Sequence, residues 1–331
     1  MNKQDTIILS GIQPSGKLHI GNYFGAIRQH IAMQDQGDAY YFIANYHSLT
    51  SLKNGEALKQ FTFEVALDYL ALGLDPEKAT FFAQSDVPQV TELAWILGSL
   101  TPVSLMEKGV SYKDKVAAGL HPNIGLFTYP ILQAADILMY HSNIVPVGED
   151  QKQNIEICRD LASKFNHTFA GDFLVEPEEF IVKSVATVPG TDGQKMSKSY
   201  DNTLPIFDKA KSRKKKVMSI LTDSTPLEEP KDPDSDNVFA LISLFADETQ
   251  KEEIAAKYRA GGYGYGHAKK ELLFLMNDYF HEATERRVKL QENPSMVYDV
   301  LREGGKRARI QAEKVMQPIR EVTGIHRSFN I

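Results

Sequence analysis

The sequence predicts an α/β protein, with a Rossmann-like doubly wound parallel sheet followed by a helical C-terminal part. In residues 1–203, short apolar segments rich in β-branched and aromatic side chains alternate with longer segments of helical periodicity. That alternation is typical of parallel strands joined by crossover helices. After about residue 203 the strand-like segments disappear, and only helical patterns remain. We therefore expect two domains, 1–203 and 204–331.

The first domain should contain four strands and five helices. The strands are expected at residues 6–9, 39–44, 79–84 and 144–147, each a short apolar run bounded by turn-forming residues. The helices are expected at 22–34, 56–72, 89–100, 126–140 and 150–165. Gly73 should end the second helix, because glycine readily adopts the left-handed conformation of a helix terminus. The helix at 126–140 is apolar nearly all round, which indicates that it is buried.

The second domain should be a helical bundle. Helices are expected at residues 209–221, 238–245, 249–258, 267–287 and 294–324. Residues 222–236 hold three prolines and six acidic residues, so they should form a loop. The last helix is a candidate to pack back on the first domain.

Composition narrows the class of protein. The chain has 331 residues, a formal net charge of −6 and one cysteine, Cys158, which excludes a disulfide framework and an iron–sulfur cluster ligated by several cysteines. No segment has the composition of a signal peptide or a membrane span, so we expect a soluble cytoplasmic protein. The acidic balance argues against a general nucleic-acid coat protein. Residues 209–216, with five lysines and one arginine, form either a solvated helix face or a local RNA contact.

The first motif lies between the first strand and its helix, at residues 13–22 (Gln-Pro-Ser-Gly-Lys-Leu-His-Ile-Gly-Asn). Parallel sheets bind ligands at this position, beyond the carboxyl end of a strand and in front of a helix N-terminus. Free backbone N–H groups and the helix dipole favour a phosphate there. His19 can donate a hydrogen bond to a phosphate oxygen, and Gly21 allows a flat ring to approach the backbone. Alone, the motif is equally compatible with a tight turn and a surface histidine.

The second motif is residues 189–202 (Pro-Gly-Thr-Asp-Gly-Gln-Lys-Met-Ser-Lys-Ser-Tyr-Asp-Asn). Lys195 and Lys198 bring two ammonium groups within reach of one polyphosphate, and Ser197 and Ser199 add hydroxyl donors. Such an array suits the charge that develops on a leaving pyrophosphate. The alternative is a solvated basic loop.

Together the two motifs resemble the HIGH and KMSKS signatures of class I aminoacyl-tRNA synthetases, with Asn22 in place of the last histidine of the first signature. Four further segments look like bacterial tryptophanyl-tRNA synthetases: residues 10–16, 22–26, 129–138 and 145–153. The resemblance runs from about residue 8 to residue 202 and continues more loosely beyond. It implies that residues 204–331 bind the anticodon of tRNA.

The resemblance also implies residue roles. The catalytic residues would be His19, Lys195, Ser197 and Lys198. ATP would be bound by Gln13, Pro14, Ser15, Gly21, Asn22, Gly148, Glu149, Asp150, Val188, Lys195, Met196, Ser197, Lys198 and Ser199. Mg²⁺ would be held mainly through the nucleotide, with no metal ion ligated by the protein alone.

Asp136 is the residue implied to recognise tryptophan. It lies in the apolar helix, where an unpaired carboxylate would be costly, and an indole N–H is a donor without acceptor capacity. A carboxylate paired with a nearby lysine or backbone donor is the alternative. The rest of the tryptophan pocket would be Tyr129, Gln133, Ile137, Val145, Val147 and Gln151.

The implied activity is ATP-dependent activation of L-tryptophan and its transfer to tRNA(Trp) by a homodimer. Tyrosyl-tRNA synthetases are the closest alternative, because they carry a similar arrangement to Tyr129, Gln133 and Asp136. Many tryptophan enzymes have methionine at the position of Gln133. The segments 13–15 and 148–151 favour tryptophan. Adenylyltransferases share a turn like the first motif, but they are generally shorter and lack a long helical C-terminal part. A relative that binds tRNA without charging it usually loses residues of one motif, whereas His19, Lys195 and Lys198 are all present.

Overall fold

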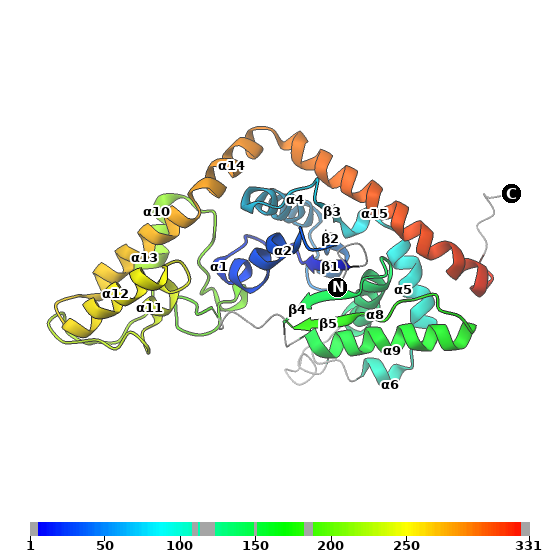
Figure 1. The fold of residues 1–331 in the computed structure, drawn as a ribbon, viewed down its shortest axis with the longest axis horizontal. Coiled ribbons are helices and arrows are strands. Elements are labelled where there is room, and N and C mark those ends of the chain that lie inside the picture. The colour runs from blue at the N-terminus through cyan, green and yellow to red at the C-terminus, as the bar shows by residue number, and fades with distance from the viewer. Residues whose placement is uncertain (1–5, 108–111, 113–122, 149–150, 182–187, 326–331) are drawn as a thin grey trace.

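The first domain is built on a five-stranded parallel sheet (Figure 1). The computed structural model describes residues 6–107, 112, 123–148, 151–181 and 188–325. The strands are β1 (Ile7–Ile12), β2 (Asp38–Ile43), β3 (Ala79–Ala83), β4 (Ile144–Val147) and β5 (Glu178–Ile181). Their order is β3-β2-β1-β4-β5, and every neighbouring pair is parallel. The order reverses direction between β1 and β4, so the predicted doubly wound sheet is confirmed.

Successive side chains of each strand enter two different apolar cores. Ile8, Tyr41 and Phe81 pack with the helices that follow β1 and β2. Their neighbours Leu9, Phe42 and Phe82 pack on the opposite face. Because adjacent strand residues point to opposite faces, this alternation buries the sheet on both sides.

Each face is covered by its own helices. One face carries α1 (Ile20–Asn22), a π-helical turn at Tyr23–Ile27, α2 (Arg28–Met33) and α4 (Gly55–Leu72). The other carries α5 (Gln89–Leu100), α8 (Ile124–Leu138) and α9 (Lys152–Phe169). The predicted helices at 56–72 and 89–100 are confirmed, and Gly73 is left-handed with φ of 111°. The helix predicted at 22–34 begins two residues earlier, because the side chain of His19 caps it.

Besides the 3₁₀ turn Lys198–Tyr200 within the second motif, four short elements were not predicted. They are β5, α3 (Asn45–Ser48), the 3₁₀ turn Gln84–Asp86 and α6 (Val103–Met106). The sequence of β5 begins with two glutamates, which do not read as a strand. The other three are single turns, too short to show helical periodicity.

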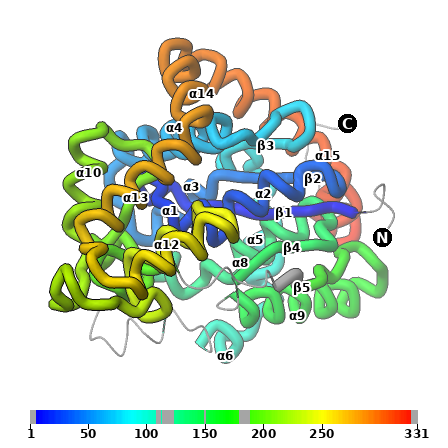
Figure 2. Tube along the Cα trace, turned by 60° about the vertical axis from the view of Figure 1, so that its left-hand side comes forward, coloured from blue at the N-terminus to red at the C-terminus, as the bar shows by residue number. Residues whose placement is uncertain are grey.

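The remaining helices form a lobe beside the sheet, and the last two of them run from this lobe back across the sheet (Figure 1). They are α10 (Ala210–Met218), α11 (Asn237–Ile242), α12 (Glu248–Ala260), α13 (Tyr265–Tyr279), α14 (His281–Glu292) and α15 (Pro294–Thr323). No strand occurs after residue 203 among the described residues. In both views α14 lies over α4 (Figures 1 and 2).

The single helix predicted at 267–287 is wrong, because the chain breaks at Phe280. Phe280 is buried in an aromatic cluster with Tyr23, Phe24, Phe245 and Tyr279. The hydroxyl groups of Tyr23 and Tyr279 lie 3.2 Å apart. Tertiary packing of this ring, which helical periodicity does not reveal, therefore sets the break. The cluster also joins the helical lobe to the segment that follows His19.

Helix α15 wraps the β3 edge of the sheet. Its first part contributes Val297 and Leu301 to one core, and its later part, from Ala308 to Ile319, contributes to the other. Arg307 donates hydrogen bonds to the carbonyl oxygens of Pro76 (2.7 Å) and Ala79 (3.1 Å). An open strand edge invites pairing with other chains, and α15 covers this one.

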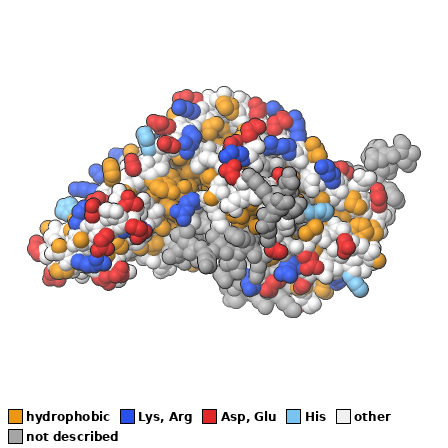
Figure 3. Space-filling model, viewed as in Figure 1, with side chains coloured by type: hydrophobic (Ala, Val, Ile, Leu, Met, Phe, Trp, Pro, Cys, Tyr) orange, Lys and Arg blue, Asp and Glu red, His pale blue; other side chains and the backbone are white. Residues whose placement is uncertain are grey.

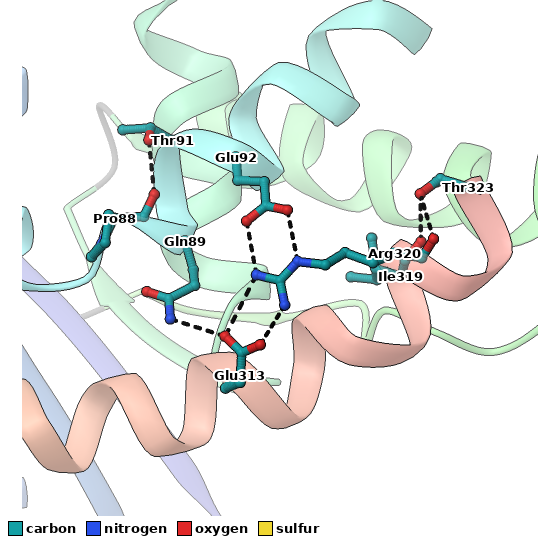
Figure 4. Close-up of polar contacts among 8 residues, drawn as sticks. All are labelled: Pro88, Gln89, Thr91, Glu92, Glu313, Ile319, Arg320 and Thr323. Atoms are coloured by element: carbon teal, nitrogen blue, oxygen red, sulfur yellow. Dashed lines mark hydrogen bonds and ion pairs between the residues drawn. The ribbon is translucent and has the colours of Figure 1, made fainter. Parts of the chain in front are cut away.

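Ion pairs fix the far end of α15 to α5 (Figure 4). The guanidinium of Arg320 donates to both carboxylate oxygens of Glu92, at 2.7 and 2.8 Å. It also contacts Glu313 on its own helix, and Glu313 accepts a hydrogen bond from Gln89 at 3.1 Å. Bidentate, partly buried arginine pairs of this kind hold a defined geometry.

Gly304→Ala should destabilise the protein. A Cβ at this position would overlap the backbone carbonyl of Phe81, which cannot move without distorting β3. Overpacking of this kind costs about 1–3 kcal/mol, so the Tm of a protein of this size should fall by roughly 2–4 °C. Gly266→Ala is the matched control, because a Cβ there meets open space and alanine favours a helix. Equal Tm values for the two variants, measured by circular dichroism, would contradict the proposed close approach.

Candidate active site

A cavity of about 590 Å³ opens at the carboxyl ends of β1 and β4, where the strand order reverses. This is the position at which doubly wound sheets bind ligands. All seven residues predicted for tryptophan line it: Tyr129, Gln133, Asp136, Ile137, Val145, Val147 and Gln151. Two residues predicted for ATP, Gln13 and Gly148, line it as well. The structure thus brings α8, β4 and the end of β1 together around one space.

Asp136 lies deep in this cavity and is 3% exposed. Its Oδ2 atom accepts hydrogen bonds from His47 Nε2 at 3.0 Å and from Gln84 Nε2 at 2.7 Å. Burial raises the pKa of the Asp136 carboxyl, while these two donors partly oppose the rise. Both donors act on the same oxygen, so Oδ1 takes part in neither of these two hydrogen bonds. The carboxylate is paired, but with neither of the partners that the sequence suggested, a lysine or a backbone donor.

Gln151 organises another part of the cavity lining. Its Oε1 accepts hydrogen bonds from Asn154 Nδ2 at 2.9 Å and from Gln133 Nε2 at 3.3 Å. Asn154 also donates to the hydroxyl of Tyr129 at 3.5 Å. Polar groups therefore occur both beside Asp136 and around Gln151, and the same lining includes apolar side chains such as Ile137 and Val145.

Three residues of this site were missed by the sequence analysis: His47, Gln84 and Asn154. His47 was interpreted as a packed or surface histidine, and it is packed, but against Asp136. His47 and Gln84 follow β2 and β3 directly, and carboxyl ends of parallel strands meet at one edge. That positional rule could have found both of them. Asn154 lies within a helix, where its spacing gave no signal.

A second hollow, of about 530 Å³, lies between the two sequence motifs. It is lined by Ser15, His19, Asn22, Met196, Ser197, Lys198 and Ser199. Residues 13–15 connect it to the first cavity, because Gln13 lines one space and Ser15 the other. The fold therefore unites two segments that lie about 180 residues apart in the sequence, as the motifs predicted.

His19 caps the helix that begins at Ile20. Its Nδ1 accepts a hydrogen bond from the backbone N–H of Asn22 at 3.3 Å, and the Asn22 side chain accepts one from the His19 N–H at 3.1 Å. Burial, together with the positive charge of Lys198, lowers the pKa of His19 to about 4. The ring is therefore neutral at pH 7, with its proton on Nε2. Asn22 completes this reciprocal cap, which gives a structural role to the departure from the HIGH signature.

Asn202 holds the second motif in shape. Its Oδ1 accepts a hydrogen bond from the Ser197 N–H at 2.7 Å, and its Nδ2 donates to Asp192 at 2.8 Å and to the Lys195 carbonyl at 3.1 Å. Gly190 is required beside it, since a Cβ there would overlap the Asn202 amide. One buried amide thus fixes the backbone of the loop.

Lys198 crosses the second hollow to the first motif. Its Nζ donates to Ser15 Oγ at 3.1 Å and to the Gly16 carbonyl at 3.0 Å. Burial lowers the pKa of Lys198 to about 8, although Asp68 nearby acts in the opposite direction. The ammonium group therefore stands where an anionic ligand would meet both motifs.

Not every predicted ATP residue lines these two spaces. Pro14, Gly21, Val188 and Lys195 do not, although a Cβ on Gly21 would lie 2.9 Å from His19 Nδ1. The backbone of Val188 pairs with the second motif, since its carbonyl accepts the Met196 N–H at 2.9 Å. The Lys195 side chain is exposed. Glu149 and Asp150 lie outside the described residues.

Two further features concern metals and membranes. Within the described part of the chain, no group of three His, Cys, Asp or Glu residues is arranged to hold a metal ion. None of the described helices combines the length and the apolar character that a membrane span requires.

Residues 1–281 match the protein family described as tRNA synthetases class I (W and Y). A tryptophan–tRNA ligase of Fusobacterium nucleatum is 55% identical over 317 residues, covering 96% of this chain and 97% of that protein. One of Rhodopirellula baltica is 52% identical, with coverage of 96% and 99%. The crystal structure of the Campylobacter jejuni tryptophanyl-tRNA synthetase with ADP and tryptophan superposes with a TM-score of 0.92 at 50% identity, covering 96% of this chain and all of that chain.

Fold, paired motifs and matched family together define a class I aminoacyl-tRNA synthetase. The doubly wound parallel sheet and the joined signatures are those that the sequence led us to expect of this class. Within the class, the chain belongs to the tryptophan–tRNA ligase family.

Gln84→Leu should weaken the use of tryptophan, because it removes one of the two donors that hold Asp136 and leaves the Tyr46 N–H without its acceptor. A hydrogen bond to a charged group contributes about 1.5–3 kcal/mol, so KM for tryptophan should rise by roughly 10-fold or more. Gln89→Leu is the control, because Gln89 is another buried glutamine that instead bonds Glu313. Equal KM values for the two variants would show that Gln84 does not position Asp136.

Proposed function

We propose that the protein activates L-tryptophan with ATP to form tryptophanyl-adenylate and then transfers the aminoacyl group to tRNA(Trp). The observation that carries this proposal is the junction of the two spaces. A cavity with a buried, doubly hydrogen-bonded carboxylate adjoins a hollow with a neutral histidine and a lysine. An indole and a polyphosphate require complementary groups of these two kinds.

The indole would occupy the deep part of the cavity. Its N–H donates to Oδ1 of Asp136, while His47 and Gln84 hold Oδ2. A site built to accept this hydrogen bond rejects phenylalanine, because the buried acceptor would then be unpaired. Gln151 and Tyr129 would face the ammonium group of the amino acid, and Ile137, Val145 and Val147 the ring.

ATP would extend along the carboxyl edge of the sheet. Gly148, Glu149 and Asp150 would contact the ribose and adenine from one side. From the other side the nucleotide would meet the predicted residues of the two motifs: Gln13, Pro14, Ser15, Gly21, Asn22, Val188, Met196 and Ser199. ATP enters as its Mg²⁺ complex, the ion being held by phosphate oxygens.

Adenylate formation is an in-line displacement. A carboxylate oxygen of tryptophan bonds to the α-phosphorus, and the bond from this phosphorus to the oxygen bridging to the β-phosphate breaks, so pyrophosphate leaves. Lys198 stabilises the charge that develops on the pyrophosphate, and the neutral His19 donates through Nε2–H. Ser197 adds a hydroxyl donor. Lys195 joins them when the loop closes over the nucleotide. Catalysis is positioning plus charge stabilisation, without a covalent nucleophile.

In the second step the 2′-hydroxyl of the terminal adenosine of tRNA attacks the carbonyl carbon, and AMP leaves. We assign residues 1–203 to catalysis and residues 204–331 to anticodon binding, with the basic helix α10 available to phosphates. The protein would act as a cytoplasmic homodimer. Trp95, Val103 and Ile124 are exposed apolar residues on α5, α6 and α8, which supports association. Sedimentation equilibrium at micromolar concentration tests this, and a monomer would exclude it.

The decisive test is pyrophosphate exchange into ATP with each of the twenty amino acids. Tryptophan-dependent exchange is the expected result. Tyrosine-dependent exchange would assign the protein to the related specificity, and no exchange with any amino acid would favour a non-charging relative.

The pH profile provides an independent prediction. Lys198, with a pKa of about 8, is charged below this pH and loses its charge as the pH rises through it. His19, with a pKa of about 4, stays neutral across the range. Therefore kcat/KM for ATP should be level near pH 6–7 and fall above about pH 8. Lys198→Arg should remove this alkaline fall, because a guanidinium remains charged. An unchanged fall in that variant would assign it to another group.

A further inference from the structure

A third hollow, of about 430 Å³, runs between α4, the turn after β3 and α15. It is separate from the two spaces described above and has no role in the proposed adenylation. Its lining comprises Asn45, Gly55, Leu58, Lys59, Thr62, Phe63, Ala83, Ser85, Asp86, Tyr298, Leu301, Arg302 and Arg309. We call this hollow the α4–α15 groove.

The α4–α15 groove has an excess of positive charge. Lys59, Arg302 and Arg309 line it, against one acidic residue, Asp86. Arg302 is paired with Asp299 at 2.6 Å, whereas the described ion pairs include neither Lys59 nor Arg309. Elsewhere along α15 basic and acidic side chains are interspersed (Figure 3). Arg309 interacts electrostatically with Asp86 of the same lining. The exposed side chains of Lys59 and Arg309 supply the positive charge that an anionic ligand in the groove would meet.

The groove also presents flat apolar surface. The rings of Phe63 and Tyr298 lie 5.1 Å apart between centroids, at an interplanar angle of 34°. Tyr298 is 48% exposed, so part of this ring pair is accessible to a ligand. Leu58 and Leu301 line the same space. Cations beside exposed aromatic rings are the combination with which proteins bind single-stranded nucleic acids.

The position of the groove connects it to the active site. Asn45 and Ser85 line the groove and form two hydrogen bonds with each other. Asn45 Nδ2 donates to Ser85 Oγ at 2.7 Å, and the Ser85 N–H donates to Asn45 Oδ1 at 3.0 Å. The adjacent Gln84 donates to Asp136. His47 and Thr50 line the first cavity, while Gly55 and Lys59 line the groove, so the α3–α4 segment borders both.

We infer that the α4–α15 groove binds the unpaired 3′ strand of tRNA just before its terminal adenosine. This inference rests on the proposed function, because the terminal adenosine must reach the first cavity for transfer. The nucleotides that precede it then pass along the same edge of the sheet. A base stacks on Tyr298, and phosphates contact Lys59 and Arg309. Unpaired bases expose the faces that such stacking needs, unlike those within a duplex.

Three single variants test the inference: Lys59→Ala, Arg309→Ala and Tyr298→Ala, with Tyr298→Phe to retain the ring. The control is Lys314→Ala, an exposed lysine on α15 outside the groove. We measure tryptophan-dependent pyrophosphate exchange and the KM for a tRNA(Trp) transcript. Removing a stacked ring should raise KM about 5-fold or more. Each lost phosphate contact should reduce, by about one, the slope of the logarithm of tRNA affinity against the logarithm of salt concentration. Pyrophosphate exchange should remain at the wild-type rate in every variant. Tyr298→Phe and Lys314→Ala should also keep the wild-type KM for the transcript.

A second measurement shows which part of the tRNA lies in the groove. We compare binding of the intact transcript with binding of one whose unpaired 3′ nucleotides have been removed. If the inference holds, wild type loses affinity on truncation and the groove variants lose much less. Equal weakening for both transcripts would place the contact elsewhere on the tRNA and overturn the inference, as would a wild-type KM in all three groove variants. If the wild-type protein showed no tryptophan-dependent pyrophosphate exchange, that result would instead refute the proposed function.

Discussion

Asp136→Ala should abolish most tryptophan-dependent activity while leaving ATP binding nearly unchanged. The variant removes the proposed acceptor of the indole N–H and leaves the donors of His47 and Gln84 without their partner. Hydrogen bonds to charged groups contribute about 1.5–3 kcal/mol each, and unpaired buried donors add a penalty. We expect kcat/KM for tryptophan to fall by roughly 100-fold or more. Steady-state pyrophosphate exchange measures this directly.

Asp136→Asn should be nearly as harmful, although it preserves the shape of the side chain. The carboxylate offers two acceptor oxygens, one for the pair of protein donors and one for the indole. An amide has one oxygen, so either orientation points its NH₂ group at a donor. Asp160→Ala is the control, because it removes an exposed carboxylate from the neighbouring helix α9. Wild-type kcat/KM for tryptophan in both Asp136 variants would refute its assignment.

Lys198→Ala should slow adenylate formation without a matching loss of tryptophan affinity. The ammonium group lies between the two motifs. In the proposed mechanism it would meet charge that grows only as pyrophosphate leaves. Removing one preorganised donor to a developing anion costs about 100- to 1000-fold in rate. Single-turnover adenylate formation measures the rate, and tryptophan binding is measured separately by calorimetry.

The matched control for this variant is Lys214→Ala, on the exposed face of α10. It should leave both quantities unchanged. A Lys198→Ala protein that forms adenylate normally but no longer binds tryptophan would show that the lysine supports the amino-acid pocket rather than the phosphates.

The sequence predicted the parts of this molecule that depend on local patterns. Helices such as Gln89–Leu100 follow from apolar periodicity. The residue types of the two motifs predicted that they bind phosphate groups. Placing Asp136 in the cavity lining also succeeded, because its family context is distinctive. Its partners His47 and Gln84 were not predicted from residue type, because they lie in α3 and in the 3₁₀ turn after β3. Only their position beyond the carboxyl ends of β2 and β3 indicates that they lie near Asp136.

Tertiary packing also explains the remaining differences. The break at Phe280 depends on rings contributed by Tyr23 and Phe245, more than 30 residues away in the chain. The π-helical turn after His19 has no signature in composition. Register and packing of this kind override local propensity, so periodicity alone places a continuous helix where the protein has two.

The wrapping of β3 by α15 has a consequence for biosynthesis. Translation proceeds from the N-terminus, so α15 is made after every other described element. Until then the nascent chain carries an uncapped strand with free amide and carbonyl groups, a state prone to misassembly. Ribosome-bound intermediates that end before residue 297 should therefore recruit chaperones more strongly than those that extend past residue 319.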